Sequence, residues 1–329
     1  METAPGQVIV EIELQTGRAY TAGGHSRYVS RAEASWARGV SGMGAGCVHD
    51  QTTSRQRHRW PAWKTVGVAL VAAMLAVIGF FVSAYALRSQ PGPKSLNSVI
   101  RGFKEDTAFA SVGHLRYPPP AAGVYRLQGK GSERISFPPT SQADGGTLPA
   151  TVSYSSGRCW RWHVDYNVAH WEQYQFCSDS SHLWVVDQWN GQSWDFGAVQ
   201  VTNVARLACT PATGVLPPDP TAGLRLHWTC TGVNSATSGR NTQTTTARIV
   251  SVGNLTIGHV TVRAVHEVQR TTVTGAQTGS AVENWWYSAS SGLPLRMQRE
   301  ISIHSHSPVG TVTYTEAGSW QMASLKPHV

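Results

Sequence analysis

The sequence has few charged side chains, few cysteines and few phenylalanines. Asp, Glu, Lys and Arg make up 14% of the 329 residues, and 7 Phe stand against 13 Trp. This composition is too apolar and too aromatic for a wholly disordered chain. Five Cys are too few for a small domain built on disulfides. A mean hydropathy of -0.23 excludes a protein with many membrane spans, although such an average can hide one apolar segment.

Sequence signatures of the common enzyme classes are also missing. The chain has no G-x-S-x-G, H-E-x-x-H, S-x-x-K, C-x-x-C or phosphate-binding loop. His163 and Asp165 share one strand face, as do His304 and His306. Neither pair has a third partner at useful spacing, so both are typical of a polar sheet surface. We therefore expect a protein that is not an enzyme, with no catalytic residue, no cofactor and no metal ion.

The formal net charge of +8 is spread along the chain. Eight basic and five acidic residues precede residue 65, and 19 basic and 14 acidic residues follow residue 87, which gives +3 and +5. A nucleic-acid interface would gather its basic residues on one face or in one stretch. We therefore predict no nucleic-acid partner.

Residues 65–87 form one uncharged apolar run, bounded by Lys64 and Arg88. About 20 such residues span a bilayer core. Basic residues are more frequent just before the run than just after it, which predicts a cytoplasmic N-terminus. We interpret the run as an uncleaved transmembrane signal anchor in the plasma membrane. A signal peptide cleaved after Ala86 is the main alternative, and a buried core helix is another.

The segments on either side of this run lack a domain-like pattern. Residues 1–64 are rich in Gly, Ser, Ala and Arg, which predicts a cytoplasmic, basic and mostly disordered segment, with Met1 and Met43 as alternative starts. Residues 88–122 are expected to be a juxtamembrane linker. Within it, Leu96, Val99 and Ile100 have the spacing of a short amphipathic helix.

Residues 123–329 show short runs of alternating hydrophobicity, separated by Gly, Ser, Asn and Pro. This pattern predicts one extracytoplasmic all-β domain, built as an antiparallel half-barrel, barrel or sandwich. The expected strands are 123–130, 132–137, 150–154, 158–166, 169–178, 182–188, 193–204, 224–231, 244–252, 257–270, 280–288, 294–304, 309–317 and 319–325.

Two of these strands predict a specific hairpin. If residues 158–166 and 169–177 pair around Val168, then Cys159 lies opposite Cys177. In this register the aromatic side chains share one face of the hairpin, and the polar side chains and the Cys pair share the other. We therefore predict a disulfide between Cys159 and Cys177.

The other two cysteines of the domain bracket a proline-rich loop. Cys209 and Cys230 are thus predicted to form a second disulfide, which closes that loop. An even number of Cys beyond the membrane segment is typical of an oxidising, extracytoplasmic compartment.

Tryptophan is concentrated near the hairpin. In a β domain such residues fill the core, line a pocket for an apolar ligand, or form an exposed platform for sugars. Trp189 and Trp194 flank the sequence Asn190-Gly191, which we expect at the tip of a hairpin. The candidate ligand-binding residues are Trp160, Trp162, Trp171, Trp184, Trp189 and Trp194.

The C-terminal region carries a resemblance. The run Trp285-Trp286-Tyr287, the turn at Gly292 with Leu-Pro-Leu-Arg296, and the strand ending at Tyr314 follow one another. This order resembles the closing hairpins of LolA-type half-barrels, which include lipoprotein carriers, anti-sigma regulators and lipid-carrying lipoproteins. The resemblance implies a curved sheet around an apolar ligand. The composition is also similar to that of exported, membrane-anchored proteins of high-GC Gram-positive bacteria.

Together these observations indicate a membrane-anchored extracytoplasmic protein that binds or senses a ligand. Our first hypothesis is a β domain that holds a lipid or a lipoprotein. A module that binds cell-wall glycan or another carbohydrate through exposed Trp is the second, and a hydrolase with an unidentified site is the third. The membrane itself is the one partner that the sequence predicts directly.

Overall fold

The structure is a computed structural model that describes residues 62–103, 114–211, 214–237, 239–307 and 310–328. The side chains of residues 62–69, 156 and 211 are not included in this description. The predictions for residues 1–61, including the choice between Met1 and Met43, lie outside the described residues. The chain divides into two units, with α1 mostly in one and the β domain in the other.

Two helices precede the β domain in sequence. α1 covers Ala62–Ala86 and α2 covers Leu96–Gly102, within the predicted linker. α2 begins after Ser95, whose hydroxyl oxygen accepts a hydrogen bond from the backbone N–H of Ser98, as an N-cap residue does. A search of the described residues finds no helix with both the length and the apolar character that crossing a membrane requires.

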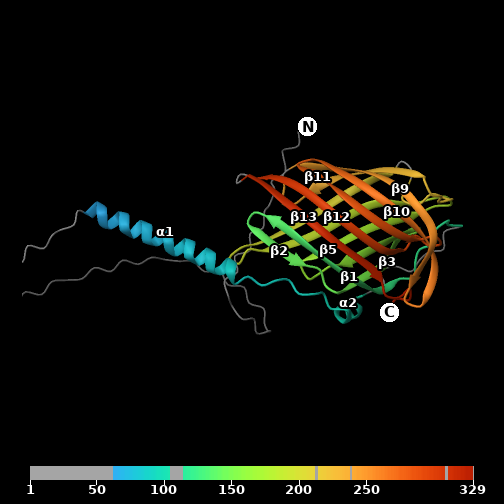
Figure 1. Cartoon of the computed structure of the whole chain (residues 1–329), viewed down its shortest axis with the longest axis horizontal. Helices are drawn as coiled ribbons and strands as arrows, with labels where there is room; N and C mark the ends of the chain where they lie inside the picture. The colour runs from blue at the N-terminus through green and yellow to red at the C-terminus, as the bar shows by residue number, and fades with distance from the viewer. Residues whose placement is uncertain (1–61, 104–113, 212–213, 238, 308–309, 329) are drawn as a thin grey trace, which may run out of the picture. The chain divides into compact units, whose positions relative to one another are not determined.

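The rest of the described chain is antiparallel β-structure, and Figure 1 shows its long strands side by side. The strands are β1 Gly123–Ser136, β2 Pro139–Ala143, β3 Thr147–Ser156, β4 Cys159–Asp165, β5 His170–Ser178, β6 Leu183–Asp195, β7 Gln200–Pro211, β8 Arg225–Asn234, β9 Arg240–Ile257, β10 Val260–Gly275, β11 Gln277–Ser288, β12 Pro294–Ser307 and β13 Gly310–Met322.

The sheet closes on itself. Each strand from β3 to β13 pairs with its sequence neighbour, and β13 pairs with β1 along residues 127–135 of β1. The other edge of β1 pairs first with β3 and then with β2. All strands except β2 therefore form a closed ring of 12. Of the three predicted alternatives, the barrel is the one that forms, and its closure pairs both edges of each described strand in the ring.

The predicted hairpin and both disulfides are confirmed. β4 and β5 pair with Cys159 opposite Cys177 and with Trp160 opposite Phe176. The structure contains the disulfides Cys159–Cys177 and Cys209–Cys230. The aromatic face of the hairpin points into the barrel, where Trp160 is fully buried.

The prediction of a turn at Asn190-Gly191 is wrong. β6 continues through both residues, and the chain turns between Asp195 and Gln200 instead. Gly191 faces outward beneath the indole of Trp171, which would lie 2.3 Å from a Cβ at this position. The glycine thus permits an aromatic ring to pack on the strand and does not form a turn. The predicted strands 309–317 and 319–325 are likewise one strand, β13.

The barrel interior changes character along its axis. On β9 the inward side chains run from Asn241 and Gln243 through Thr245 to Ala247 and Ile249. The apolar end is filled by a buried cluster rich in aromatic rings, in which the Trp320 ring lies 6.0 Å from that of Trp162 and 5.8 Å from that of Trp285. The opposite end, where β6 leads into β7 and β10 into β11, is polar.

Candidate functional site

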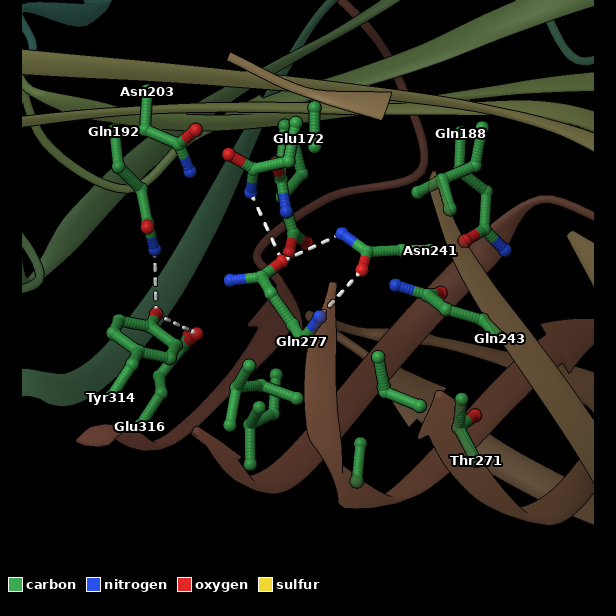
Figure 2. Close-up of a pocket in the computed structure, with 18 of the residues that line it drawn as sticks. Glu172, Gln188, Gln192, Asn203, Asn241, Gln243, Thr271, Gln277, Tyr314 and Glu316 are labelled. Atoms are coloured by element: carbon green, nitrogen blue, oxygen red, sulfur yellow. Dashed lines mark hydrogen bonds between the residues drawn. The ribbon is translucent and has the colours of Figure 1, made fainter. Parts of the chain in front are cut away.

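The polar end of the barrel holds a pocket of about 340 Å³. This volume lies in the range of small-molecule sites. Figure 2 shows its labelled side chains projecting from several strands into one space. The polar lining residues are Glu172, Gln188, Asn190, Gln192, Asn203, Asn234, Thr237, Asn241, Gln243, Thr245, Gln269, Thr271, Gln277, Glu283, Ser305, His306, Ser307, Tyr314 and Glu316.

Side-chain amides dominate one wall of the pocket. Gln277 accepts hydrogen bonds from the amides of Asn234 (3.2 Å) and Asn241 (2.9 Å) and donates one to Ser305 (2.9 Å), as Figure 2 shows in part. The amides of Gln188 and Gln243 have no hydrogen-bond partner within the described part of the chain. Each amide carries two donors and an acceptor, so this wall can bond a ligand that offers both groups.

Four aliphatic side chains of β12, β13 and β1, which we call the apolar wall, also line the pocket. Ile301 and Ile303 of β12, Val312 of β13 and Ile135 of β1 line the pocket there. Trp194, on β6, is a further lining residue, with its ring 6.4 Å from that of Tyr314. The pocket therefore offers an amide wall and an apolar wall to the same ligand.

The structure separates the six predicted tryptophans into three groups. Trp160 and Trp162 belong to the buried core of the barrel. Trp194 and Trp189 line the pocket, although the Trp189 ring also lies 5.0 Å from the Arg206 guanidinium.

The remaining two tryptophans lie elsewhere. Trp171 stacks on His163 at 5.4 Å and covers Gly191, and Trp184 donates a hydrogen bond to Asp179 at 2.8 Å. Neither lines the pocket. These two candidate ligand-binding residues therefore lie outside the pocket, because strand alternation places their indoles away from the interior.

A buried cluster of charged groups lies at the base of the pocket. Arg299 of β12 donates hydrogen bonds to Glu172 of β5 (2.6 Å) and to Glu316 of β13 (2.6 Å). The Nδ1 atom of His170 lies 3.2 Å from a carboxylate oxygen of Glu133 on β1. All five side chains are buried, so their charges depend on one another for compensation. We call these five residues the ionic cluster.

Tyr314 connects two carboxyl groups of the ionic cluster. Its hydroxyl lies 2.9 Å from Glu133 and 2.6 Å from Glu316, and it accepts a hydrogen bond from Gln192 at 2.7 Å. A phenol has one proton to donate, so it can satisfy only one of two ionised carboxylates. Burial raises the pKa of Glu316, whereas that of Glu133 is lowered, so Glu316 is the more readily protonated of the two carboxyl groups.

The pKa values of His170 and Glu133 are both shifted towards the charged form. Burial alone would lower the pKa of His170, but the nearby carboxylates of Glu133, Glu316 and Glu172 raise it to about 9. Burial would likewise raise the pKa of Glu133, yet the His170 charge and hydrogen bonds from Gln142 and Tyr314 hold it below its ordinary value. The cluster therefore contains both charged and proton-carrying acids in one buried volume.

Burial shifts three further acids towards their neutral form. Burial raises the pKa of Asp144 and of Glu283 to about 7 and that of Glu267 to about 8. Glu283 lines the pocket, whereas Glu267 lies deeper and receives one long hydrogen bond, 3.4 Å, from Gln269. The base of the pocket is thus rich in groups that accept or release protons near neutral pH.

Of the acid and histidine pairs considered in the sequence, only His306 lines the pocket. The His163 Nε2 atom lies 3.3 Å from a carboxylate oxygen of Asp165. On β12, His304 and His306 contact the hydroxyls of Thr313 and Thr311 on the neighbouring strand. None of these four residues is a member of the ionic cluster, so the cluster is a separate arrangement.

The sequence did not identify the ionic cluster. Its members come from strands at opposite ends of the domain, and each alone is an ordinary polar residue in a strand. The sequence does contain one usable signal. Arg299 lies between Met297 and Ile301, where alternation calls for an apolar inward residue. Glu316 holds the equivalent position between Tyr314 and Trp320. A charge within an inward-facing alternation indicates a buried polar site.

Comparisons with known proteins add little to this description. No family model and no curated protein matches the chain. Among solved structures, it is similar to the hypothetical lipoprotein YmcC from Escherichia coli, with 11% sequence identity and a TM-score of 0.29. The similarity covers 70% of this chain and 98% of that one. We draw no functional argument from so distant a similarity.

Proposed function

We propose that the barrel is an extracytoplasmic binding domain that holds a small, hydroxyl-rich ligand of the glycan type in its polar end. The observation that carries this proposal is the amide wall, which extends over β8, β9 and β11. It includes the amide of Gln243, which has no hydrogen-bond partner among the residues that the structure describes. Sugar hydroxyls both donate and accept hydrogen bonds, which matches the donors and acceptor of each amide. The apolar wall with Trp194 faces the C–H surface of such a ligand.

A lipid or lipoprotein ligand is the second candidate, favoured by the apolar wall of Ile301, Ile303 and Val312. An acyl chain in this pocket would cover Gln188 and Gln243 without offering them a hydrogen bond. Leaving a buried polar group unsatisfied costs about 1–3 kcal/mol. The buried aromatic cluster also fills the other end of the barrel. We therefore place the glycan ligand first.

The experiment is a binding measurement on the purified protein with two kinds of probe. Soluble oligosaccharides released from digested cell wall are titrated in a calorimeter, and gently extracted protein is analysed by native mass spectrometry for retained lipid. Saturable oligosaccharide binding is the expected result. Retained lipid without oligosaccharide binding would replace the glycan proposal by the lipid one. The absence of both oligosaccharide binding and retained lipid would refute ligand binding in the barrel.

A matched pair of variants locates the ligand. Gln243→Leu removes an amide from the pocket wall and should weaken oligosaccharide binding by about tenfold or more, since one lost hydrogen bond of about 1.4 kcal/mol corresponds to a factor of ten. Gln175→Leu makes the same change on β5, at a position that does not line the pocket. It should bind as the wild type does. Equal losses in both variants would place the ligand elsewhere.

We further propose that residues 65–87 anchor this domain in the plasma membrane with the N-terminus in the cytoplasm. The two disulfides of the domain support an oxidising compartment for residues after 123. A C-terminal fusion to a reporter enzyme that folds only outside the cytoplasm should be active in cells, and the protein should resist extraction by alkaline carbonate. An inactive reporter would refute the orientation, and release by carbonate would refute the anchor.

A further inference from the structure

Three side chains of the ionic cluster converge on one small volume. Glu133 on β1 and Glu316 on β13 are direct partners in the strand register that closes the barrel, and His170 begins β5. One potential ligand atom from each lies within 4.8 Å of the other two. Two carboxylates and one imidazole at such separations are a donor set that divalent transition-metal ions bind.

His170 gives an independent indication of a ligand. Its side chain is 1% exposed, and neither ring nitrogen has a hydrogen-bond partner in the described residues. Nδ1 approaches Glu133 to 3.2 Å without the alignment of a hydrogen bond. Buried polar side chains nearly always have a hydrogen-bond partner, whereas this imidazole has only its ion pair with Glu133. Coordination through a ring nitrogen would supply the missing partner.

The carboxylates are held in place by a shell of further hydrogen bonds. Gln142 and Gln192 donate to the two oxygens of Glu133, at 2.5 Å and 2.9 Å. Arg299 donates to one oxygen of Glu316, and Tyr314 contacts the other. Outer partners of this kind orient ligating carboxylates in metalloproteins. The shell therefore fixes the donor atoms before any ion arrives.

The charges of the cluster also suit a divalent cation. When ionised, Glu133, Glu172 and Glu316 carry a total charge of −3, and Arg299 contributes +1. Without an ion, protons on His170 and Glu316 offset this charge. A divalent ion would displace those protons and balance the remaining −2 in their place. Glu316, Gln192 and Tyr314 line the pocket, which gives an ion a route from solvent.

We propose that Glu133, His170 and Glu316 bind one divalent transition-metal ion at the base of the pocket. The nitrogen ligand and the small ligand number favour ions of the zinc or manganese type over calcium and magnesium, which take oxygen ligands in larger numbers or keep their water. This site does not depend on the identity of the ligand proposed above.

The test is a titration of the chelator-stripped full-length protein with Zn²⁺ and, separately, with Co²⁺. We expect one ion per chain to bind with high affinity and to resist competition by millimolar Ca²⁺ or Mg²⁺. His170→Gln and Glu316→Gln should each weaken binding by more than about tenfold, because changes even in the outer shell of a metal site cost about 10–100-fold. His163→Gln alters a histidine on the outer face of the adjacent strand and should leave binding unchanged.

Every outcome of this experiment bears on the proposal. Wild-type protein that binds no Zn²⁺ or Co²⁺ overturns it, whatever the variants do. Binding that His170→Gln and Glu316→Gln leave intact overturns it as well, because the ion then lies elsewhere. Near-UV circular dichroism reports whether these two variants keep the native aromatic packing, and Glu133→Gln provides a third ligand change should either of them unfold.

Discussion

Glu267 allows a direct measurement of the free-energy cost of ionising a carboxyl group inside the barrel. Its side chain is 0% exposed, its Oε2 has no hydrogen-bond partner in the described residues, and its Oε1 receives one weak bond from Gln269. Burial raises its pKa from 4.5 to about 8. The folded protein therefore keeps this carboxyl neutral at pH values where the unfolded chain ionises it.

The sign and size of the effect follow from linkage. Below pH 4.5 the carboxyl is protonated in both states, and its full contribution to stability is present. As the pH rises towards 8, ionisation favours the unfolded chain, by about 1.4 kcal/mol for each unit above 4.5. At pH 7.5 the group has thus removed about 4 kcal/mol from the free energy of unfolding. Glu267→Gln is neutral at every pH and does not lose this contribution.

The assay is urea unfolding, followed by tryptophan fluorescence, of the wild type and the variant between pH 4.5 and 7.5. The two should have similar free energies of unfolding at pH 4.5, and the variant should be more stable by about 4 kcal/mol at pH 7.5. Because Asp144 and Glu283 titrate in the same range, the difference between the proteins at each pH is the relevant quantity. Glu300→Gln changes an exposed carboxyl on β12 and serves as the control.

A stability difference that stays constant over this pH range would refute the reasoning. It would mean that Glu267 ionises at the same pH in the folded and unfolded states, which requires water or a cation beside its carboxyl. A Glu267→Gln variant that is less stable than the wild type at pH 7.5 would also refute the reasoning. The site would then stabilise the ionised carboxylate more than a neutral amide.

Three further predictions concern the parts of the barrel that surround the site. Arg299→Met should lower the free energy of unfolding by about 3–5 kcal/mol in denaturant titrations, because it leaves buried carboxylates unpaired. The control Arg296→Met removes only a cation–π contact and should lower it by about 1 kcal/mol. Replacing Cys159 and Cys177 by Ala opens a loop of 18 residues and should lower the free energy of unfolding by about 3 kcal/mol. Reduction of this disulfide can then cause no further loss of stability in the variant. Gly191→Ala should displace the Trp171 ring and cost about 1–3 kcal/mol, which Trp171→Ala in the same chain should largely relieve.

The hairpin around Val168 shows what local sequence can predict. Its register was specified three times over, by the Cys pair, by the aromatic pairs and by the polar face, and a shift of one residue would have broken all three. The turn at Asn190-Gly191 had only one signal. That signal failed because a glycine that makes room for an indole cannot be distinguished by sequence from a glycine that forms a turn.

The pocket could be predicted only in part, for a reason that lies in the alternation of strands. Alternation divides a strand into two faces, but hydrophobicity identifies the inner face only when the interior is apolar. At the polar end of β6, Gln188 points inward and the neighbouring Trp189 contacts Arg206, which is exposed. If the apolar Trp189 is assigned to the interior, alternation places the Gln188 amide outside, and the sequence then does not predict the amide wall.

The ionic cluster depends on barrel closure, and closure is a property of the whole chain. Glu133 and Tyr314 are 181 residues apart, and Glu172 and Arg299 are 127 apart, yet each pair is in hydrogen-bond contact. These contacts exist only because β13 pairs with β1 and because the ring is small enough for β5 to face β12 across the interior. Strand number and register set that distance. An error of one strand in the sequence-based list would move Arg299 away from both of its carboxylates, so the cluster becomes visible only once the ring is complete.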